Sequence, residues 1–174
     1  MTDTGAPPRV LIVVAAVLAA ALAVVVAVLG VLSSGDDEGT ETGPLPLVSI
    51  PAPKSGSPEC AKVMEAAPGE LESSGEPLER RELAEPAPPA TVAWGADNPV
   101  VLRCGLERPP ELTPTSSLRQ INGVGWLEVP GEGSATWYVV DRPVYLALTV
   151  PAGSGTGPLQ QISDTIRNTL PTNN

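Results

Sequence analysis

The feature that most constrains this chain is an uninterrupted hydrophobic run over residues 10–32. Its 23 residues carry no charge and no proline. A helix rises about 1.5 Å per residue, so a helix of this length spans about 34 Å, and the hydrocarbon core of a bilayer is about 30 Å thick. The run therefore predicts a transmembrane helix. The orientation of that helix then determines the compartment in which the rest of the chain lies.

The flanks of this run predict its processing and its orientation. The run is longer than the apolar part of a secretory signal, about 7–15 residues, and residues 31–34 form a poor cleavage site. We therefore expect an uncleaved signal-anchor, with a cleaved signal peptide as the alternative. Arg9 precedes the run and three acidic residues follow it at 36–38, which predicts a cytoplasmic N-terminus over residues 1–9 and an extracytoplasmic remainder. The predicted location is the cell membrane, with a single pass.

Four alanines in the run share one helix face at a spacing of four residues. They are Ala15, Ala19, Ala23 and Ala27. Small residues on one face let two membrane helices pack closely, so this stripe is a candidate helix-packing surface. The alternative is that the stripe reflects only the alanine-rich composition of the segment.

The residues after the run are sufficient for one domain preceded by a linker. Proline and acidic, small residues over 33–56 predict an extended linker, and residues 57–174 form the predicted domain. The formal net charge of −10 argues against nucleic acid as a partner. Histidine is absent, which removes the commonest general base and metal ligand. We therefore expect no catalytic residues, no metal and no cofactor.

The two cysteines, Cys60 and Cys104, both lie in the predicted extracytoplasmic part. An isolated pair in an oxidising compartment favours a disulfide, and two thiols without histidine make a poor zinc site. Closing a loop of about 45 residues stabilises a fold by roughly 4 kcal/mol in the chain-entropy model. We therefore predict a Cys60–Cys104 disulfide.

The pattern of the domain predicts an α+β fold. Ser57 and Pro58 begin a helix that places Cys60 on its apolar face. Pro158 begins a second helix, which ends near residue 170. Residues 70–89 are expected to be irregular surface chain and 108–117 a proline-rich loop. Strands are expected over 91–94, 100–104, 125–129, 135–140 and 144–150. Short connections make neighbouring strands antiparallel, so the prediction is a small antiparallel sheet with two helices on one face, stapled by one disulfide.

Several short motifs over residues 57–170 resemble those of an actinobacterial family of membrane-anchored envelope proteins, a domain-of-unknown-function family with the number 3515. The motifs are Cys60, Arg80-Arg81, Trp94-Gly95, Pro99, Leu102-Arg103-Cys104-Gly105, Asn122-Gly123-Val124, Trp126 and Asp141-Arg142-Pro143-Val144-Tyr145. The chain departs from the family pattern at Ala96-Asp97-Asn98, where Asp-Pro-Pro is expected nearer the glycine. The resemblance implies a place in the cell envelope and no established activity.

The main functional hypothesis is a non-catalytic binding or accessory module of the bacterial cell envelope, whose partner is an envelope protein or a cell-wall polymer. The candidate binding surface consists of Trp94, Arg103, Asp141, Arg142 and Tyr145, because these polar and aromatic residues lie on the mixed sheet face or near strand ends. The alternative for each is an ordinary role in the core, in a turn or in a surface ion pair.

Four weaker hypotheses remain open. Asp97, Glu107 and Asp141 are candidates for the paired carboxylates of an envelope hydrolase or transferase. The alanine stripe would suit a helper subunit of a larger membrane complex. The glycine-rich stretch 151–157, expected to be a flexible loop before the last helix, resembles an anion-binding loop but lacks the lysine of a phosphate loop. The Arg80-Arg81 pair is another candidate anion site, but three flanking glutamates favour a solvated charge cluster.

Overall fold

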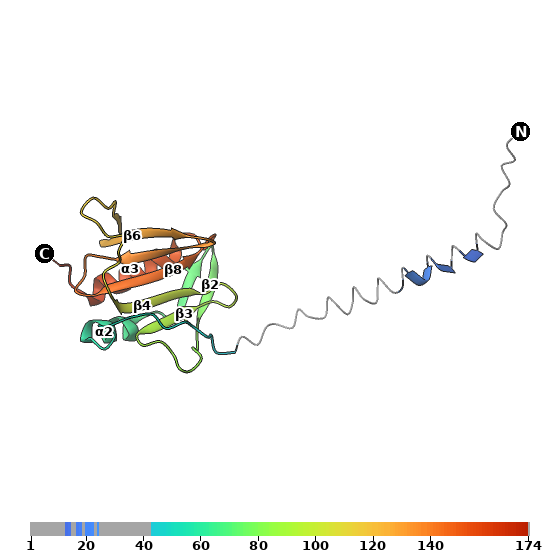
Figure 1. Ribbon diagram of the computed structural model, residues 1–174, viewed down its shortest axis with the longest axis horizontal. Helices are drawn as coiled ribbons and strands as arrows, with labels where there is room; N and C mark the ends of the chain where they lie inside the picture. Colours follow the sequence, from blue (N-terminus) through green and yellow to red (C-terminus); the bar gives the residue numbers. More distant parts are fainter. Residues whose placement is uncertain (1–12, 15–16, 19, 23, 25–42, 174) are drawn as a thin grey trace, which may run out of the picture. The chain divides into compact units, whose positions relative to one another are not determined.

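The structure is a computed structural model that describes residues 13–14, 17–18, 20–22, 24 and 43–173 (Figure 1). The chain divides into two compact units, residues 1–41 and 42–174. The described residues of the first unit are helical and exposed. In the part of the chain that the structure describes, no helix is both long and apolar enough to cross a membrane. The predicted span 10–32 falls mostly outside that part, and the stripe of Ala15, Ala19, Ala23 and Ala27 falls wholly outside it.

The second unit contains one antiparallel sheet of eight strands (Figure 1). Its spatial order is β1-β2-β3-β4-β8-β7-β6-β5, so two four-stranded meanders join through the pairing of β4 with β8. The strands are β1 (Glu70–Ser73), β2 (Glu76–Arg81), β3 (Thr91–Trp94), β4 (Val100–Leu106), β5 (Arg119–Ile121), β6 (Val124–Gly131), β7 (Ser134–Val139) and β8 (Tyr145–Pro151). The predicted antiparallel sheet is confirmed, with three more strands than expected.

Two helices complete the domain, α2 (Pro58–Ala66) and α3 (Gly157–Thr169). Helix α2 begins at Pro58 as predicted, and α3 begins one residue before the predicted Pro158. The hydroxyl of Ser57 accepts a hydrogen bond from the Cys60 N–H at 3.2 Å and caps α2. Helix α3 reaches both edges of the sheet. The Glu72 N–H in β1 donates to Gln161 Oε1 at 2.7 Å, and Asn122, directly after β5, donates to Asp164 Oδ1 at 3.1 Å. The sheet therefore curves around α3.

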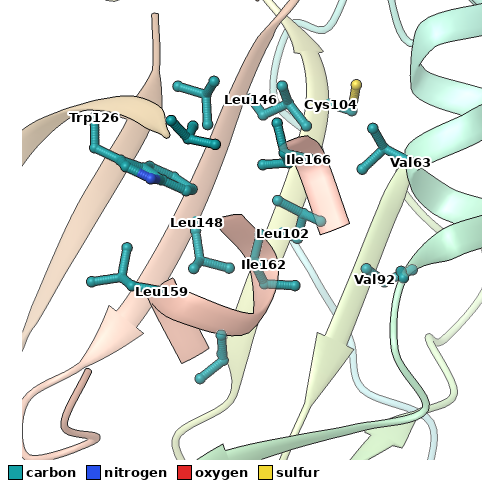
Figure 2. Packing of buried hydrophobic residues seen from close by; sticks show 14 of the residues in the cluster. Val63, Val92, Leu102, Cys104, Trp126, Leu146, Leu148, Leu159, Ile162 and Ile166 are labelled. Carbon is teal, nitrogen blue, oxygen red and sulfur yellow. The ribbon is translucent and has the colours of Figure 1, made fainter. Parts of the chain in front are cut away.

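The core lies between the helices and the inward face of the sheet (Figure 2). Ile162 and Ile166 of α3 face Leu102 of β4 and Leu146 and Leu148 of β8, and all five are fully buried. Burying one such side chain contributes about 1.5–3 kcal/mol, so this contact is a main source of stability. The apolar face of α3 is therefore the face that packs on the sheet.

The predicted disulfide is confirmed. The sulfur atoms of Cys60 and Cys104 are 2.03 Å apart, and both residues are fully buried. The bond joins α2 to β4, the strand through which the two meanders meet. It therefore fixes the first helix to the centre of the sheet.

The expectation of irregular chain over 70–89 was wrong for its first half, which forms the β1–β2 hairpin. Ser74 and Gly75 have φ values of 52° and 85°, and a two-residue turn with both φ values positive is the connection that suits the twist of two antiparallel strands. Leu71 is buried and Leu78 half-buried, while the glutamates between them face solvent. The strand alternation is present, but it rests on one leucine in each strand.

Residues 43–56, assigned to the linker from sequence, lie along the domain. Leu45 pairs with the chain at Leu83, and the Lys54 N–H donates to the Gly105 carbonyl at 2.9 Å. This segment crosses the sheet face opposite the helices, where Arg103 reaches the Val48 carbonyl at 3.4 Å. The sheet is consequently covered on both faces near β4, which corrects the expectation of a sheet covered on one face only.

Candidate functional site

The structure does not bring the five predicted surface residues together. Trp94 is fully buried and donates its Nε1–H to the Pro68 carbonyl at 2.8 Å, so it belongs to the core. Arg103 and Tyr145 lie on the sheet face opposite the core, as judged by the β4–β8 register. Asp141 and Arg142 lie beyond the end of β7 and contact each other.

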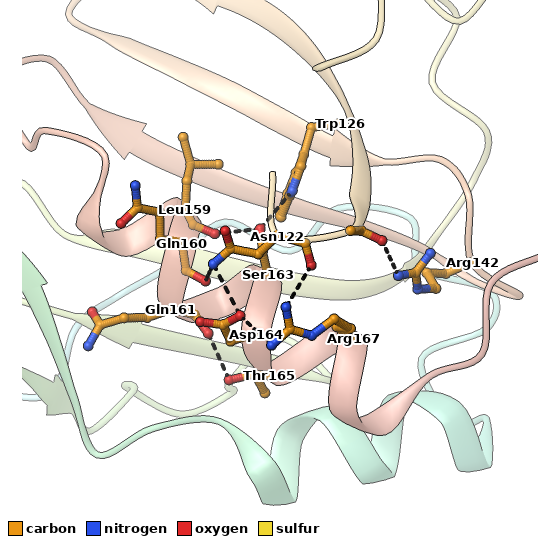
Figure 3. A network of polar contacts seen from close by, with 11 residues as sticks. Asn122, Trp126, Arg142, Leu159, Gln160, Gln161, Ser163, Asp164, Thr165 and Arg167 are labelled. Carbon is orange, nitrogen blue, oxygen red and sulfur yellow. Dashed lines mark hydrogen bonds and ion pairs between the residues drawn. The ribbon is translucent and has the colours of Figure 1, made fainter. Parts of the chain in front are cut away.

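Asp141 and Arg142 form a structural ion pair at the end of the sheet. Arg142 is 3% exposed, and its guanidinium contacts Asp141 Oδ2 at 2.9 Å. The guanidinium also donates to the Gly123 carbonyl at 2.8 Å (Figure 3). Asp141 Oδ2 also accepts the Gly125 N–H at 2.8 Å. The pair therefore fixes the turn between β5 and β6, and we assign it to the fold.

Replacing Arg142 with methionine is expected to lower the free energy of unfolding by about 2 kcal/mol. The substitution leaves the Asp141 carboxylate without its cation, and breaking a fully buried pair costs about 3–5 kcal/mol. The Asp141 side chain is 22% exposed, so water offsets part of that cost. Urea unfolding measures the difference. Arg167→Met, which breaks the exposed Arg167–Asp164 pair, should cost less than about 1 kcal/mol, and an equal loss in both variants would contradict the assignment.

A second group of polar side chains lies on the sheet face that points away from the core. Tyr138 and Arg103 flank Ala147 across neighbouring strands. Burial raises the pKa of the Tyr138 phenol, Glu111 raises it further, and Arg103 opposes both. Burial also lowers the pKa of Arg103, against the effect of Tyr138, and its Nε has no hydrogen-bond partner among the described residues.

Tyr138 predicts a loss of stability at high pH. Its pKa is raised in the folded state, so the unfolded chain loses the phenolic proton first, beginning near pH 10. The free energy of unfolding should therefore fall as the pH rises above about 10 and through the folded pKa. Tyr138→Phe should remove this part of the pH dependence, whereas Tyr145→Phe should keep it. Urea unfolding at a series of pH values measures both slopes, and an unchanged slope in Tyr138→Phe would refute the prediction.

The candidate functional site is a cleft of about 580 Å³ on the helix-bearing side of the sheet. Ile121, Trp137, Val150 and Leu159 form an apolar floor, and Arg119 of the edge strand β5 lies at the rim. The volume falls within the range of ligand pockets, about 300–1,000 Å³. The other lining residues are Gln120, Gly131, Gly133, Ser134, Ala135, Pro151, Ala152, Gly153, Ser154, Gly155 and Thr156.

Strand register and side-chain size create this hollow. Ala135 pairs with Val150, and Trp137 pairs with Leu148 two residues further along β7. The small side chain of Ala135 therefore leaves space at the strand ends, beside the wide face of the Trp137 indole. Beyond Pro151 the chain leaves the sheet as the glycine-rich loop 152–156 and forms the opposite wall.

The loop 152–156 is held by the β1–β2 hairpin from the other edge of the sheet. The Ser73 hydroxyl donates to the Ser154 carbonyl at 3.1 Å, and the Ser74 hydroxyl donates to the Gly153 carbonyl. A Cβ on Gly157 would lie 2.2 Å from the Glu72 carbonyl oxygen, so the backbones meet closely there. The stretch expected to be a flexible loop is thus anchored at successive points, and the wall of the cleft is preformed.

Charge distinguishes this cleft from two smaller cavities of the domain. Its lining includes one cation, Arg119, and no carboxylate. The cavity of about 420 Å³ is lined by Glu79 and Glu82, and that of about 310 Å³ by Glu72. The Arg119 Nε contacts Glu128 Oε2 at 3.0 Å, and its guanidinium carbon lies 6.0 Å from the centre of the Trp137 ring. The cleft therefore combines an aromatic surface with a cation.

The three candidate catalytic carboxylates do not share a site. Asp97 lies in the β3–β4 turn and Glu107 follows the opposite end of β4, so seven strand residues, about 23 Å, separate them. Asp141 is held by Arg142. Within the described residues, no group of three or more His, Cys, Asp or Glu side chains could hold a metal ion.

Arg81 of the candidate anion site Arg80-Arg81 has a structural role. It donates to the Ala96 carbonyl at 2.6 Å and to the Gly43 carbonyl at 2.7 Å, and so it connects distant parts of the chain.

Sequence reasoning identified only one wall of the cleft, the glycine-rich loop. Arg119 and Trp137 were not singled out. The available clue was Trp137 itself, a large aromatic side chain on the inward-facing register of a strand beside a small Ala135. The position of Arg119 depends on β5, a strand of three residues that the sequence analysis did not identify.

The fold and the cleft define a disulfide-stapled α+β domain with one preformed, carboxylate-free hollow at its sheet edge. A family model described as "Protein of unknown function (DUF3515)" matches residues 16–174, and the chain belongs to this family. The resemblance to family 3515 is thereby confirmed. No curated protein and no solved structure matches the chain.

Proposed function

We propose that this protein is a single-pass, membrane-anchored, extracytoplasmic binding module of the cell envelope, and that it is non-catalytic. The observation that carries the proposal is the preformed cleft of about 580 Å³, with its apolar floor and its single cation at the rim. A preformed hollow of this kind is suited to binding because little conformational freedom is lost when a ligand enters it.

Two features support the proposed compartment. The uncharged run 10–32 is long enough for a membrane span, and the chain continues with acidic residues on the side proposed to be outside. The Cys60–Cys104 bond suits an oxidising compartment. Both features favour a domain displayed on the outer side of the membrane.

The tether limits where a partner can be. Residues 43–56 belong to the domain, so only residues 33–42 separate it from the hydrophobic run. Ten residues reach at most about 36 Å when fully extended. The proposed partner is therefore an envelope protein or a cell-wall polymer close to the membrane surface. The role as a helper subunit through the alanine stripe remains compatible with this proposal.

Site-specific photo-crosslinking on native membranes tests the proposal. A photoreactive residue replaces Ala152, an exposed residue of the cleft wall, and the matched control replaces Ala61, an exposed residue of α2. We expect a crosslinked product from position 152 and none from position 61. Equal products, or none from position 152, would refute the cleft as the binding site.

A second version of this experiment separates the domain from the membrane segment. The same variants carry an unrelated membrane helix in place of residues 10–32. A product retained from position 152 means that the domain itself recognises the partner. A product lost with the foreign helix means that the native segment recruits the partner, and Ala19→Leu with Ala23→Leu should then abolish the product as well.

A further inference from the structure

We infer that the cleft binds an acidic sugar of a cell-wall polymer, with the sugar ring against Trp137 and its carboxylate at Arg119. This inference rests on the proposed function, because it takes the cleft as the binding site. It adds the chemical class of the ligand and assigns roles to two residues.

Trp137 is the tryptophan that is partly exposed, and the Arg119 guanidinium carbon lies over its ring at 6.0 Å from the centroid. Trp94 and Trp126 are fully buried, whereas Trp137 packs against the core with one part and lines the cleft with another. An indole is a rigid, flat, apolar surface with a polar edge. Its side chain has few rotatable bonds, so it loses little conformational entropy when a ligand binds. A sugar ring presents a flat C–H face to such a surface while its hydroxyl groups remain in water. An open cleft with one aromatic wall suits this amphipathic shape.

The charge of the cleft selects an anion. Arg119 is the ionisable residue of the lining, and its side chain is 67% exposed. A guanidinium presents a planar pair of donors that matches a carboxylate. A cationic ligand would meet Arg119, and the nearby Glu128 carboxylate lies outside the lining and is already paired with that arginine. Charge complementarity thus favours an acidic ligand.

Glu128 competes for the same cation. Its Oε2 lies 3.0 Å from Arg119 Nε, and its side chain is 34% exposed. An entering carboxylate therefore shares or replaces an existing ion pair. This arrangement gives the inference two substitutions of opposite sign, because removing Arg119 should weaken binding and removing the charge of Glu128 should strengthen it.

The polar groups of the wall suit the hydroxyl groups of a sugar. Ser134 and Thr156 contribute hydroxyls, and the loop 152–156 contributes closely spaced peptide groups. These groups donate and accept hydrogen bonds without charge. An acyl chain would leave them desolvated without partners, which carries a cost. A sugar is therefore favoured over a fatty acid that carries the same carboxylate.

The test is a titration of the full chain in detergent micelles, followed by intrinsic tryptophan fluorescence. The probes are N-acetylmuramic acid and N-acetylglucosamine, which share one ring and differ in the carboxylate-bearing lactyl group. We expect saturable binding of both, at least about fivefold tighter for the acid. Fluorescence reports on the cleft because Trp94 and Trp126 are fully buried away from solvent.

The variants make the expected result specific. Arg119→Gln should weaken binding of the acid about tenfold and abolish the preference between the two probes. Glu128→Gln should tighten binding of the acid severalfold. Arg108→Gln, which removes another exposed arginine whose guanidinium donates to the Leu112 carbonyl, should change neither probe. All three variants change exposed or partly exposed side chains, so folding is expected to be retained.

Four outcomes overturn the inference. They are equal affinity for the two probes, unchanged affinity in Arg119→Gln, saturable binding of decanoate in place of either sugar, and no binding of either sugar at high millimolar concentration. If sugars fail but the Ala152 crosslink persists, the ligand class is wrong and the cleft remains the binding site. If the crosslink also fails, the proposed function itself is refuted.

Discussion

Removing the Cys60–Cys104 disulfide is expected to lower the free energy of unfolding by about 4 kcal/mol. The two residues are 44 positions apart, and a cross-link over that separation restricts the unfolded chain strongly. Both cysteines are fully buried between α2 and β4, so the bond also holds the first helix against the sheet. Small domains have net stabilities of about 5–15 kcal/mol, and this loss is a large fraction of that.

Urea unfolding of Cys60→Ala/Cys104→Ala, compared with the unaltered chain, measures the effect. The unaltered chain under reducing conditions is the control, because it loses the cross-link but keeps both sulfur atoms in the core. Similar losses in the two cases would attribute the stabilisation to the cross-link. A loss below about 1 kcal/mol in the reduced chain would show that packing alone holds α2 in place.

The central elements of the fold could be predicted because each has a strong local pattern. In β8 the aliphatic residues Leu146, Leu148 and Val150 alternate with smaller or polar ones, and these three side chains are buried as the pattern predicts. The helices begin with proline at the first helical positions and carry apolar residues at helical spacing. In these segments the local preference and the tertiary contacts agree, and the predicted bounds differ from the observed ones by only a few residues.

The outer strands were missed because their pattern is weak or short. The two strands of the β1–β2 hairpin, ELES and EPLERR, carry four glutamates and only one leucine each, and the turn, Ser74-Gly75, is a less familiar pair than Asn-Gly. The β5–β6 turn is Asn122-Gly123, with φ values of 48° and 81°. That dipeptide is a strong hairpin signal, and it was used only as part of a family resemblance. The hairpin signal is therefore present in the sequence, and the strand that precedes it, β5, has only three residues.

The cleft could not be predicted from the sequence because its parts meet through tertiary structure. Arg119 and Trp137 come together through the pairing of β5, β6 and β7, and the loop 152–156 joins them by the register of β8. The same loop is held by Ser73 and Ser74, which lie about eighty residues earlier in the chain. A pattern within one segment predicts which side chains share a face. It does not predict which distant backbone approaches that face.

Replacing Gly105 with alanine is expected to lower the free energy of unfolding by about 3 kcal/mol or more. Two effects act together at this position. Gly105 has a φ of 85°, a left-handed conformation that costs an alanine about 1–2 kcal/mol. A Cβ there would lie 2.2 Å from the Ser55 nitrogen and 2.3 Å from the Lys54 carbonyl carbon, and such overpacking costs about 1–3 kcal/mol. The neighbouring atoms are backbone, so the substitution has to displace the segment 43–56 from β4.

Gly75→Ala is the matched control, because Gly75 has the same φ of 85° and an added Cβ would meet no atom within 4 Å. It should cost only the conformational part, about 1–2 kcal/mol, when both variants are compared by urea unfolding. The difference between the two variants measures how firmly residues 43–56 are held. Hydrogen exchange should show faster exchange of the Lys54 amide in Gly105→Ala alone, since that amide donates to the Gly105 carbonyl at 2.9 Å. Equal losses in the two variants, with Lys54 still protected, would mean that the segment yields at little cost.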